Sequence, residues 1–590
     1  MKDHKIFSYV DELESQYSEP IKIVEGLSIN YGDIIKTVEF YTNSKYLSGD
    51  KDELGREKPF YNIVNYRVTV AKVATDVDVK DIVYEPDSLN DAVPAMLINH
   101  EMYKYFKEVN FSEELNEMGY NRPKYGELIV KKCKGEHGTE VECCDINNLH
   151  FDPSDIDDSP IIEDFYLSPS ELSKKDGVWD NVKEVLKAHA KANKNRAAKI
   201  LVKEVSGEFP IYFHPDHEGE EDSIEYKRMC FYIAVVNEKK YLMYCEYEKE
   251  SRYMSLPWEE MSKRPGKGIV EDGFEAQAWT NDNMIATKNV MQLAGKVVFH
   301  TTSKKVAGSG NAITNVDNGH IFEREPNTEF AMLNMAPNVL PEFENQINLW
   351  KEQYNNAAST YDANTGEAPT AGTPYSQTAL LNQVANSPFE YRREEFGIFL
   401  NEILNKWIFP EIKRRITAKH YLTSEFSEEE FKMIDEDIKT KNKNKVYLDA
   451  VLNEGRAPLP GEILGADIAT EQKLSRMGKK REIEIPEGYL DIEGRVTANI
   501  TGELRNKSVI LQSLDNILKT VTASFNPNTG KYAVLEDPVL SKIFARIVEM
   551  AGIPGFFSGS LKSSGQATPG QDLQAMGQAP MMGAQPQLTA

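Results

Sequence analysis

Cysteine is scarce in this chain of 590 residues, in which five thiols lie between positions 133 and 245. A sparse, odd set in a large chain indicates reduced thiols rather than a disulfide framework. Long apolar runs are also missing, since no stretch reaches the roughly 18 residues that predict a membrane span. The first 17 residues contain no apolar core or cleavage pattern, so we expect no secretion signal.

Positive charge is in deficit, because 68 lysines and arginines face 93 aspartates and glutamates, which gives a net charge of −25. Proteins that grip duplex DNA usually present a basic face. The excess of acidic residues therefore argues against tight, general adhesion to DNA. It does not argue against local basic patches on the surface.

Catalytic and cofactor signatures are absent as well. In GKGIVEDG, Lys267 is followed by neither serine nor threonine, so the segment is no Walker A loop. The GSG at 308–310 is too short for a dinucleotide fingerprint, and neither a GxSxG elbow nor an HExxH helix occurs. We therefore expect no enzyme activity and no cofactor.

Two clusters of metal-ligand residue types are interpreted as structural. The segment FHPDHEGEE is explained by an acidic surface turn, although it could hold a cation through His214, Asp216, His217 and Glu220. The second cluster, His137 with Cys143 and Cys144, lacks the C-x2-C spacing of zinc sites. Neighbouring strand residues face opposite sides, so we expect one of these two thiols in the core, the other exposed, and no metal.

Residues 1 to about 260 mix helix and strand patterns and predict an α+β domain. Ser168-Pro169 followed by Glu171 marks a helix start. Two β-hairpins are predicted from paired strand segments on either side of polar turns: YGELIV with VECCDI, and KRMCFYIAVVN with KKYLMYCEYE.

The middle of the chain turns to longer helix patterns. One helix is predicted from Val270 to about Leu293, and a second from Pro341 to about Ser359, with short strand patterns between them. The second helix carries an apolar stripe at i, i+4, i+7 and i+11, formed by Phe343, Ile347, Trp350 and Tyr354.

The rest of the chain begins with a polar loop at 360–375. A nearly continuous helix pattern follows from Gln377 to Ile416, in which Pro388 and Pro410 are each expected to cause a kink or to cost about 3 kcal/mol of helix stability. Residues 421–555 predict a small, mostly helical unit. The final segment, rich in Gly, Gln and Pro, cannot bury enough apolar surface to fold and is expected to be disordered.

Two helices joined at their far ends by a small β module predict a stalk with a tip. Aromatic residues such as Trp350 and Tyr354 on a stalk need neighbours, and copies of the same chain in a ring would supply them. The alternative is that both helices pack on their own globular body.

In this order of parts the chain resembles the portal proteins of tailed bacteriophages. The resemblance covers roughly residues 25 to 555, and no single motif in it is as specific as a Walker A loop. The matching segments are YGELIVKK, LHFDPSD and EDFYLSPSEL in the wing, LPWEEMSKRPGKGIVEDGFEAQAWTNDN at the first stem helix, NVLPEFENQINLWKEQYNNAAS with NTGEAPTAGTPYSQTAL at the second stem helix and tunnel loop, and DIEGRVTANITGELRNKSVILQSLDNIL in the crown.

The resemblance implies an α+β portal fold that forms a ring. Its parts would be an α+β wing (1–265), stem helix 1 (266–293), a β clip (294–337), stem helix 2 (338–359), the tunnel loop and long kinked wing helix (360–420), a helical crown (421–555) and a disordered tail (556–590). The clip is short and the crown runs into the tail, so neither broad adaptor contacts nor an extended barrel is expected.

The resemblance also implies a function. Portal proteins form the dodecameric channel at one capsid vertex, through which double-stranded DNA is packaged and later ejected. The chain would then be a non-enzymatic virion protein, assembled in the host cytoplasm, without membrane contact. Its partners would be further copies of itself, the large terminase subunit, head–tail adaptor and tail proteins, and the major capsid protein. Twelve copies would carry a charge of −300, and an acidic wall lets DNA slide without phosphate contacts.

Residue roles follow from the same resemblance. The tunnel loop would brush DNA with Asp362, Asn364, Thr365, Glu367, Thr370 and Thr373, unless it is a disordered surface insertion. The stem residues are Gln277, Lys288, Lys296, Trp350 and Tyr354, of which the two lysines are candidate positive spots facing DNA. The clip residues Lys304, Lys305, His320, Glu323 and Arg324 would contact the terminase or an adaptor, unless they only keep a hairpin soluble.

Two other interpretations stay open. One is a different structural ring protein of a virion, such as a capsid or tail-ring component, although the order of helices does not suit a capsid fold. The other is a soluble intracellular enzyme with diverged motifs, for which no catalytic set is visible.

Overall fold

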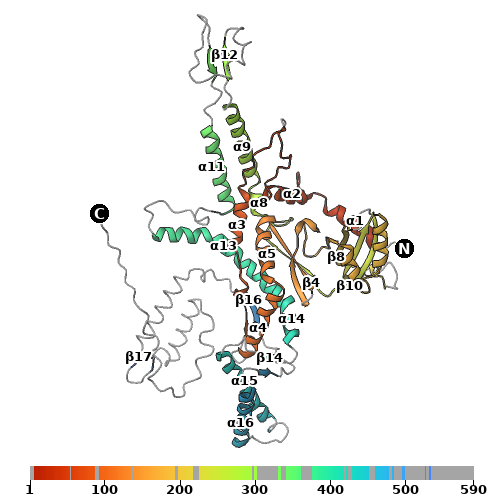
Figure 1. The fold of residues 1–590 in the computed structure, drawn as a ribbon, viewed down its shortest axis with the longest axis vertical. Coiled ribbons are helices and arrows are strands. Elements are labelled where there is room, and N and C mark those ends of the chain that lie inside the picture. Colours follow the sequence, from red (N-terminus) through yellow and green to blue (C-terminus); the bar gives the residue numbers. More distant parts are fainter. Residues whose placement is uncertain are drawn as a thin grey trace, which may run out of the picture. The chain divides into compact units, whose positions relative to one another are not determined.

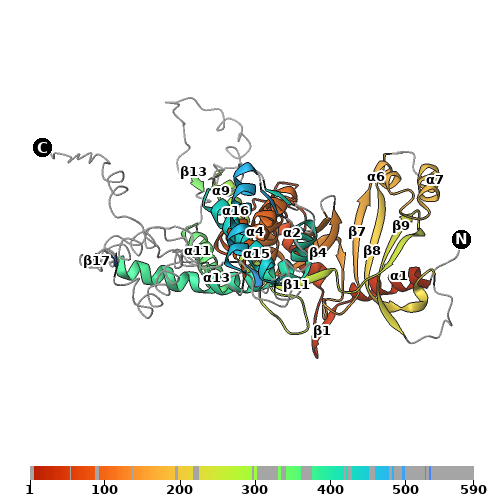
Figure 2. The same ribbon diagram turned by 90° about the horizontal axis from the view of Figure 1, so that it is seen from below.

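The computed structural model describes most of the first 500 residues and two short strands beyond them. The described residues are 5–52, 55–86, 92–135, 138–192, 197–216, 225–294, 298–301, 330–333, 340–360, 375–416, 420–422, 428–448, 450, 459–477, 481–483, 494–498, 525–526 and 531–532. They form a mixed α+β fold (Figures 1 and 2).

The chain divides into two compact units, one of residues 1–85 and 94–500 and one of residues 86–93 and 501–590. In the second unit the structure describes a short antiparallel ladder between β17 (Phe525–Asn526) and β18 (Lys531–Tyr532). The sequence predicts helices at 502–521 and 538–551, and both lie outside the described residues.

A five-stranded antiparallel sheet in the order β10-β9-β8-β7-β6 forms one module of the larger unit. Its strands are β6 (Leu149–His150), β7 (Ile161–Leu167), β8 (Ile200–Pro210), β9 (Tyr226–Val236) and β10 (Lys239–Tyr247). Alternate residues of the long strands are buried on opposite faces. Helix α1 (Lys5–Tyr17) covers one face, and α6 (Pro169–Lys174) with α7 (Val182–Ala192) covers the other.

The local signals in this module were predicted correctly. β9 and β10 form the expected hairpin, with Asn237 and Glu238 both at positive φ in its turn. The expected helix start is a capping box, in which the hydroxyl of Ser168 accepts from the Glu171 amide while the Glu171 carboxylate accepts from the Ser168 amide.

A three-stranded sheet in the order β11-β4-β5 lies beside this module. It contains the other predicted hairpin, β4 (Glu127–Gly135) with β5 (Gly138–Cys143), and adds β11 (Tyr253–Pro257). The expectation that one of Cys143 and Cys144 is exposed is wrong, because both thiols are buried. They do face opposite sides, but a hydrophobic core covers each side.

The largest core lies where one face of this sheet meets helices from distant parts of the chain. It is formed by α4 (Ala92–Glu108), α5 (Phe111–Tyr125) and the C-terminal half of a long helix after residue 388. A second core on the other face joins α2 (Tyr31–Thr42) and α3 (Val64–Ala74) to the start of the predicted stem.

The long helix predicted from Gln377 to Ile416 is present. α13 (Tyr375–Ile403) continues through Pro388, next to which Phe389 is buried in the second core. A kink or a loss of helix stability at Pro388 stays a prediction. The helix changes to a π-helical segment at Leu404–Ile408, just before Pro410 in the first turn of α14 (Phe409–Ile416).

The two predicted stem helices are also present. The first is divided into α8 (Ile269–Asp272) and α9 (Phe274–Ala294), whereas the sequence predicted one helix. The second is α11 (Leu340–Ala357), which has Pro341 in its first turn as predicted. Between them, β12 (Val298–Thr301) pairs antiparallel with β13 (Phe330–Leu333).

Two further helices and three short strand pairs complete the described fold. α15 (Glu428–Leu448) packs against α16 (Pro460–Met477), in the region 421–555 that was predicted to be mostly helical. The remaining strand pairs are β1 (Ile21–Val24) with β2 (Leu27–Ile29), β14 (His420–Leu422) with β15 (Arg481–Ile483), and β3 (Ile82–Pro86) with β16 (Gly494–Ala498); 3-10 turns lie at Val79–Asp81, Ile146–Asn148 and Ile211–Phe213. None of the described helices has the length and hydropathy needed to cross a bilayer.

Candidate functional site: the α9–α11 stem and its attachment

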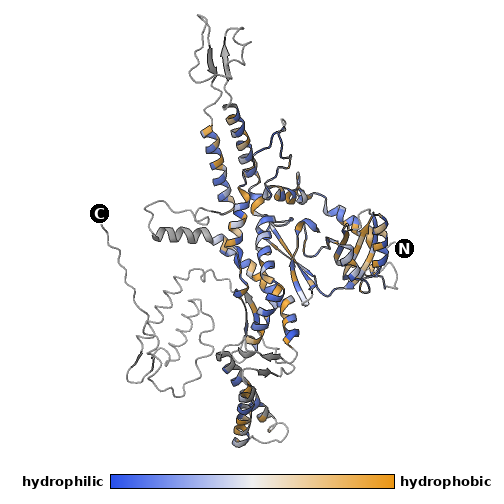
Figure 3. Ribbon diagram, viewed as in Figure 1, coloured by the Kyte–Doolittle hydropathy of each residue, from blue (hydrophilic) through white to orange (hydrophobic). Residues whose placement is uncertain are grey.

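Helices α9 and α11 lie side by side, and the sequence order places the β12–β13 ladder at their connected ends (Figure 1). α9 carries three charged residues in 21 and is otherwise rich in Asn, Gln, Ala and Thr. Figure 3 shows hydrophilic and apolar residues mixed along both helices. A surface with so few charges is unusual for helices that are bathed in water on most sides.

The two tryptophans of the pair stack on each other. The ring centroids of Trp279 and Trp350 are 5.8 Å apart and the planes differ by 4°. Trp350 is half-buried, while Trp279 remains 52% exposed. Leu349 and Met291 on the same helices are 55% and 56% exposed. The helix pair therefore presents large apolar side chains that no described residue covers.

Tyr354 attaches α11 to the body. It is 1% exposed, and its hydroxyl donates to the Ile269 carbonyl at 2.8 Å. The guanidinium of Arg67 lies 4.2 Å from the ring centroid and donates to the Asn355 side chain and the Lys351 carbonyl. A Cβ on Gly273 would lie 2.7 Å from Tyr354 Cε2, which explains why the helix break occurs at a glycine.

This contact changes one part of the sequence interpretation. The ring hypothesis was motivated by neighbours that Trp350 and Tyr354 would need, yet Tyr354 finds all of its neighbours in its own chain. Of the predicted stripe, Ile347 is buried as well, and Phe343 and Trp350 are half-buried. The uncovered surface is instead the outer side of Trp279 and of Leu349.

Gln277 attaches α9 to residues 56–63, the segment just before α3, which is here called the strap. Its side chain is completely buried, accepts from the Ile63 amide at 2.9 Å and donates to the Tyr61 carbonyl at 2.8 Å. Asn281, one turn later, accepts from the Tyr61 amide at 3.1 Å. Backbone groups of an extended segment are thus satisfied by helix side chains.

Lys288 takes part in the same attachment. Its ammonium group donates to the Glu57 carbonyl of the strap, and Arg56 donates to Asn289 at 3.1 Å and to Gln292 at 2.8 Å. The ammonium group of Lys288 is thus bound by its own chain. The hypothesis that Lys288 is a positive spot facing DNA stays a prediction. Lys296, the six tunnel-loop residues and the five clip residues all lie outside the described residues.

The stem begins where two chain segments cross at glycines. Gly126, between α5 and β4, has φ +86°, and a Cβ there would lie 2.7 Å from the Lys267 carbonyl carbon. The Glu127 carboxylate beside it accepts from the Gly266 amide at 2.7 Å. Burial raises the pKa of Glu127 to about 7, and the Gly266 hydrogen bond opposes that rise only in part.

We expect Glu127→Gln to stabilise the protein at pH 8. The folded-state pKa lies above the ordinary value of 4.5, so stability falls as pH rises from about 4.5 to about 7 and stays low above it. Glutamine keeps an acceptor for Gly266 and carries no charge, so the gain at pH 8 should be about 1–3 kcal/mol. Chemical denaturation at pH 4.5 and pH 8 tests this.

The exposed Glu259→Gln serves as the control and should change stability equally little at both values. An E127Q variant that is no more stable than the parent at pH 8 would show that burial of the ionised Glu127 carboxylate does not lower the free energy of unfolding.

The metal-like clusters of the sequence do not form a site among the described residues. His214 stacks on Tyr247 with ring centroids 4.3 Å apart and accepts from the Asp216 amide, while His217 and Glu220 are not described. His137 is also not described, and burial raises the pKa of Cys143 to about 12. Glu14, His150 and Asp164 do lie close together, but Lys203 Nζ already binds Glu14 at 2.5 Å and Asp164 at 3.1 Å.

Sequence reasoning missed the groups that hold the stem in place. Arg67, the strap and the glycine crossing carry no motif, and only the phrase GKG before the first stem helix gave a local signal. Comparison of the chain with protein-family models and with curated protein sequences found no match.

Proposed function

We propose that this chain is a portal-type ring protein of a tailed bacteriophage, which forms a channel for double-stranded DNA at one capsid vertex. The observation that carries the proposal is the succession of α8–α9, the β12–β13 ladder, α11 and the long helix α13–α14 on an α+β body. This is the order of stem, clip, stem and wing helix in that family. The ring, its DNA, the terminase, the adaptor and capsid partners, and the virion location all belong to the proposal.

The physical support comes from the uncovered side of the helix pair. Half-exposed Trp279, Leu349 and Met291 on sparsely charged helices have the composition of an interface between subunits. Repeated head-to-tail contacts close into a ring when the rotation between copies is suitable. A net charge of −25 in each copy then suits a conduit that must not hold its polyanion.

Particle mass and shape test the proposal directly. Mass photometry of the purified 66.9-kDa chain should give a species near the mass of twelve copies, about 800 kDa, and negative-stain images should show a central hole. A chain that remains monomeric or dimeric at all salt and protein concentrations would contradict the ring, and with it the channel.

We expect Trp279→Glu to prevent ring assembly. The stacked indole would be replaced by a charge that must be desolvated at the subunit interface, which weakens each contact by about 2–4 kcal/mol and is repeated at every interface. The large species in mass photometry should disappear, while the melting temperature of the monomer stays close to that of the parent because Trp279 is half exposed.

Tyr166→Glu is the matched control, since Tyr166 is 56% exposed on β7, away from the stem. It should assemble like the parent. Rings formed equally well by W279E and Y166E would show that the stem is not the interface, even if the chain is a ring.

A further inference from the structure

A polar cavity of about 860 Å³ lies outside the stem, between the five-stranded sheet, the C-terminal part of β4 and the π-helical segment of the long helix. It is lined by eight basic and five acidic side chains, in a chain whose overall balance is strongly acidic. Nothing in the proposed channel function requires it. Its charge therefore calls for an explanation of its own.

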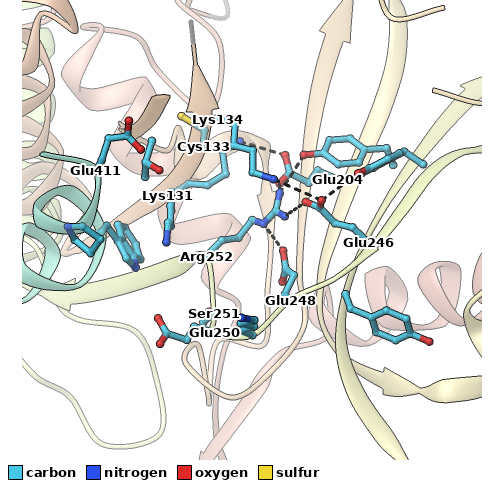
Figure 4. Close-up of a pocket in the computed structure, with 18 of the residues that line it drawn as sticks. Lys131, Cys133, Lys134, Glu204, Glu246, Glu248, Glu250, Ser251, Arg252 and Glu411 are labelled. Carbon is cyan, nitrogen blue, oxygen red and sulfur yellow. Dashed lines mark hydrogen bonds and ion pairs between the residues drawn. The ribbon is translucent and has the colours of Figure 1, made fainter. Parts of the chain in front are cut away.

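The cations inside the cavity are already neutralised. Arg252 binds Glu204 at 2.8 Å, Glu246 at 2.7 Å and also Glu248 (Figure 4). Lys131 binds Glu163 at 2.6 Å and Glu204 at 3.3 Å. The interior thus holds more carboxylates than cations, and its arginine fork cannot be used for a phosphate or a free carboxylate.

The other basic side chains that line the cavity are half-buried or exposed, and they are here called the mouth cations: Lys132, Lys134, Lys175, Lys249, Lys406 and Arg414. Three of them are already paired, Lys134 with Glu246 at 3.8 Å, Lys406 with Glu402 at 2.5 Å and Arg414 with Glu411 at 2.6 Å. The other three, Lys132, Lys175 and Lys249, make no ion pair with a described residue. Lys134 and Arg414 are highly exposed, with 87% and 72% of their side chains accessible. The mouth cations come from five different helices, strands or loops of the chain. Such an arrangement fits a ligand with several negative charges spread along its length, rather than a single anion.

Three aromatic side chains that line the same cavity form a row. Trp179 and Tyr232 have ring centroids 5.0 Å apart, and Tyr232 and Tyr244 are 6.1 Å apart. All three side chains are part of the cavity wall and none is completely buried. An aromatic or large apolar side chain of a ligand can pack on this row.

We propose that this cavity binds an acidic segment of a partner protein, with an aromatic residue seated on the Trp179–Tyr232–Tyr244 row and flanking carboxylates on the mouth cations. Backbone amides of the segment can donate to Glu246 and Glu248 in the interior. A nucleic acid fits less well, because it carries a phosphate beside every base and would place charge against those carboxylates. The proposal is independent of ring formation.

The experiment measures fluorescence anisotropy with the purified full-length chain. The probe is a fluorescein-labelled nonapeptide with four glutamates on each side of a central phenylalanine. Binding should weaken at least about tenfold when the glutamates are replaced by glutamines, and severalfold when the phenylalanine is replaced by alanine. It should also weaken as salt is raised.

A double variant tests the location. Lys132→Glu with Lys249→Glu reverses two mouth charges and should weaken peptide binding at least about tenfold. Lys36→Glu with Lys187→Glu makes the same change of charge at two exposed lysines outside the cavity and should bind like the parent. Unchanged melting temperatures would show that all four substitutions leave the fold intact.

Two outcomes would overturn the proposal. Equal loss of binding in both double variants would mean that peptide binding depends only on the net charge of the protein and not on the cavity. A single-stranded nonanucleotide that binds as tightly as the peptide, and is lost with the mouth variant, would reassign the cavity to nucleic acid.

Discussion

Gly126→Ala is expected to unfold the junction between body and stem. Gly126 has φ +86°, which costs a residue with a Cβ about 1–2 kcal/mol. The added methyl would also lie 2.7 Å from the Lys267 carbonyl carbon and closer still to Gly266 O and Gly268 N. All three are backbone atoms of the segment Gly266–Gly268 that crosses Gly126. The two crossing segments therefore cannot move apart without displacing α8. We expect a loss of more than about 4 kcal/mol, measured by chemical denaturation.

Gly119→Ala provides a matched control seven residues earlier. Gly119 lies within α5, and the nearest atom to its added Cβ is Lys72 Cγ at 4.0 Å. Alanine should therefore be neutral there or stabilise the helix by up to about 1 kcal/mol. If G126A unfolds at the same denaturant concentration as G119A, the close crossing of the two glycine segments does not exist in solution.

The helix pair was predictable because its signals are local. The stripe of Ile347 and Tyr354 repeats with the period of a helix, and Pro341 marks its first turn. Both features can be read without knowledge of the partner. The need for glycine at position 273, where the helix breaks, could not be predicted, because it depends on the ring of Tyr354, 81 residues later in the chain.

The attachment of the stem to the body could not be predicted either, because it also depends on residues that are distant in the sequence. Gln277 was named as a stem residue, but its role depends on the backbone of Tyr61 and Ile63 more than 200 residues earlier. A glutamine on a polar helix predicts a solvated face, whereas here it is completely buried. No pattern within one helix distinguishes these two environments.

One prediction failed because tertiary packing overrides a local rule. Strand alternation correctly placed Cys143 and Cys144 on opposite faces, but exposure depends on whether helices cover the second face, which the strand itself does not encode. The kink or loss of helix stability expected at Pro388 stays a prediction, since α13 continues through this residue with Phe389 packed beside Trp258.

Arg122→Met is expected to detach the long helix from the body. Arg122 is 2% exposed and joins three elements, since it donates to the carbonyl of Pro257 at the end of β11, to the Arg392 carbonyl of α13 and to the Glu395 carboxylate. Burial lowers its pKa to about 10, so it is still charged at neutral pH. Methionine fills most of the volume but leaves two carbonyls and a carboxylate without this donor. We expect a loss of about 3–5 kcal/mol.

A double-mutant cycle separates the ion pair from the carbonyl contacts. Glu395→Gln removes the charge that Arg122 balances, so R122M should cost about 1–2 kcal/mol less in that background. Arg392→Met removes a second, more exposed partner of Glu395 and should cost under about 1 kcal/mol. Arg122→Lys keeps the charge but cannot reach both carbonyls with one ammonium group, so it should remain clearly destabilised. If R122K is as stable as the parent, the fork that joins α5, β11 and α13 contributes no more than a single charge would.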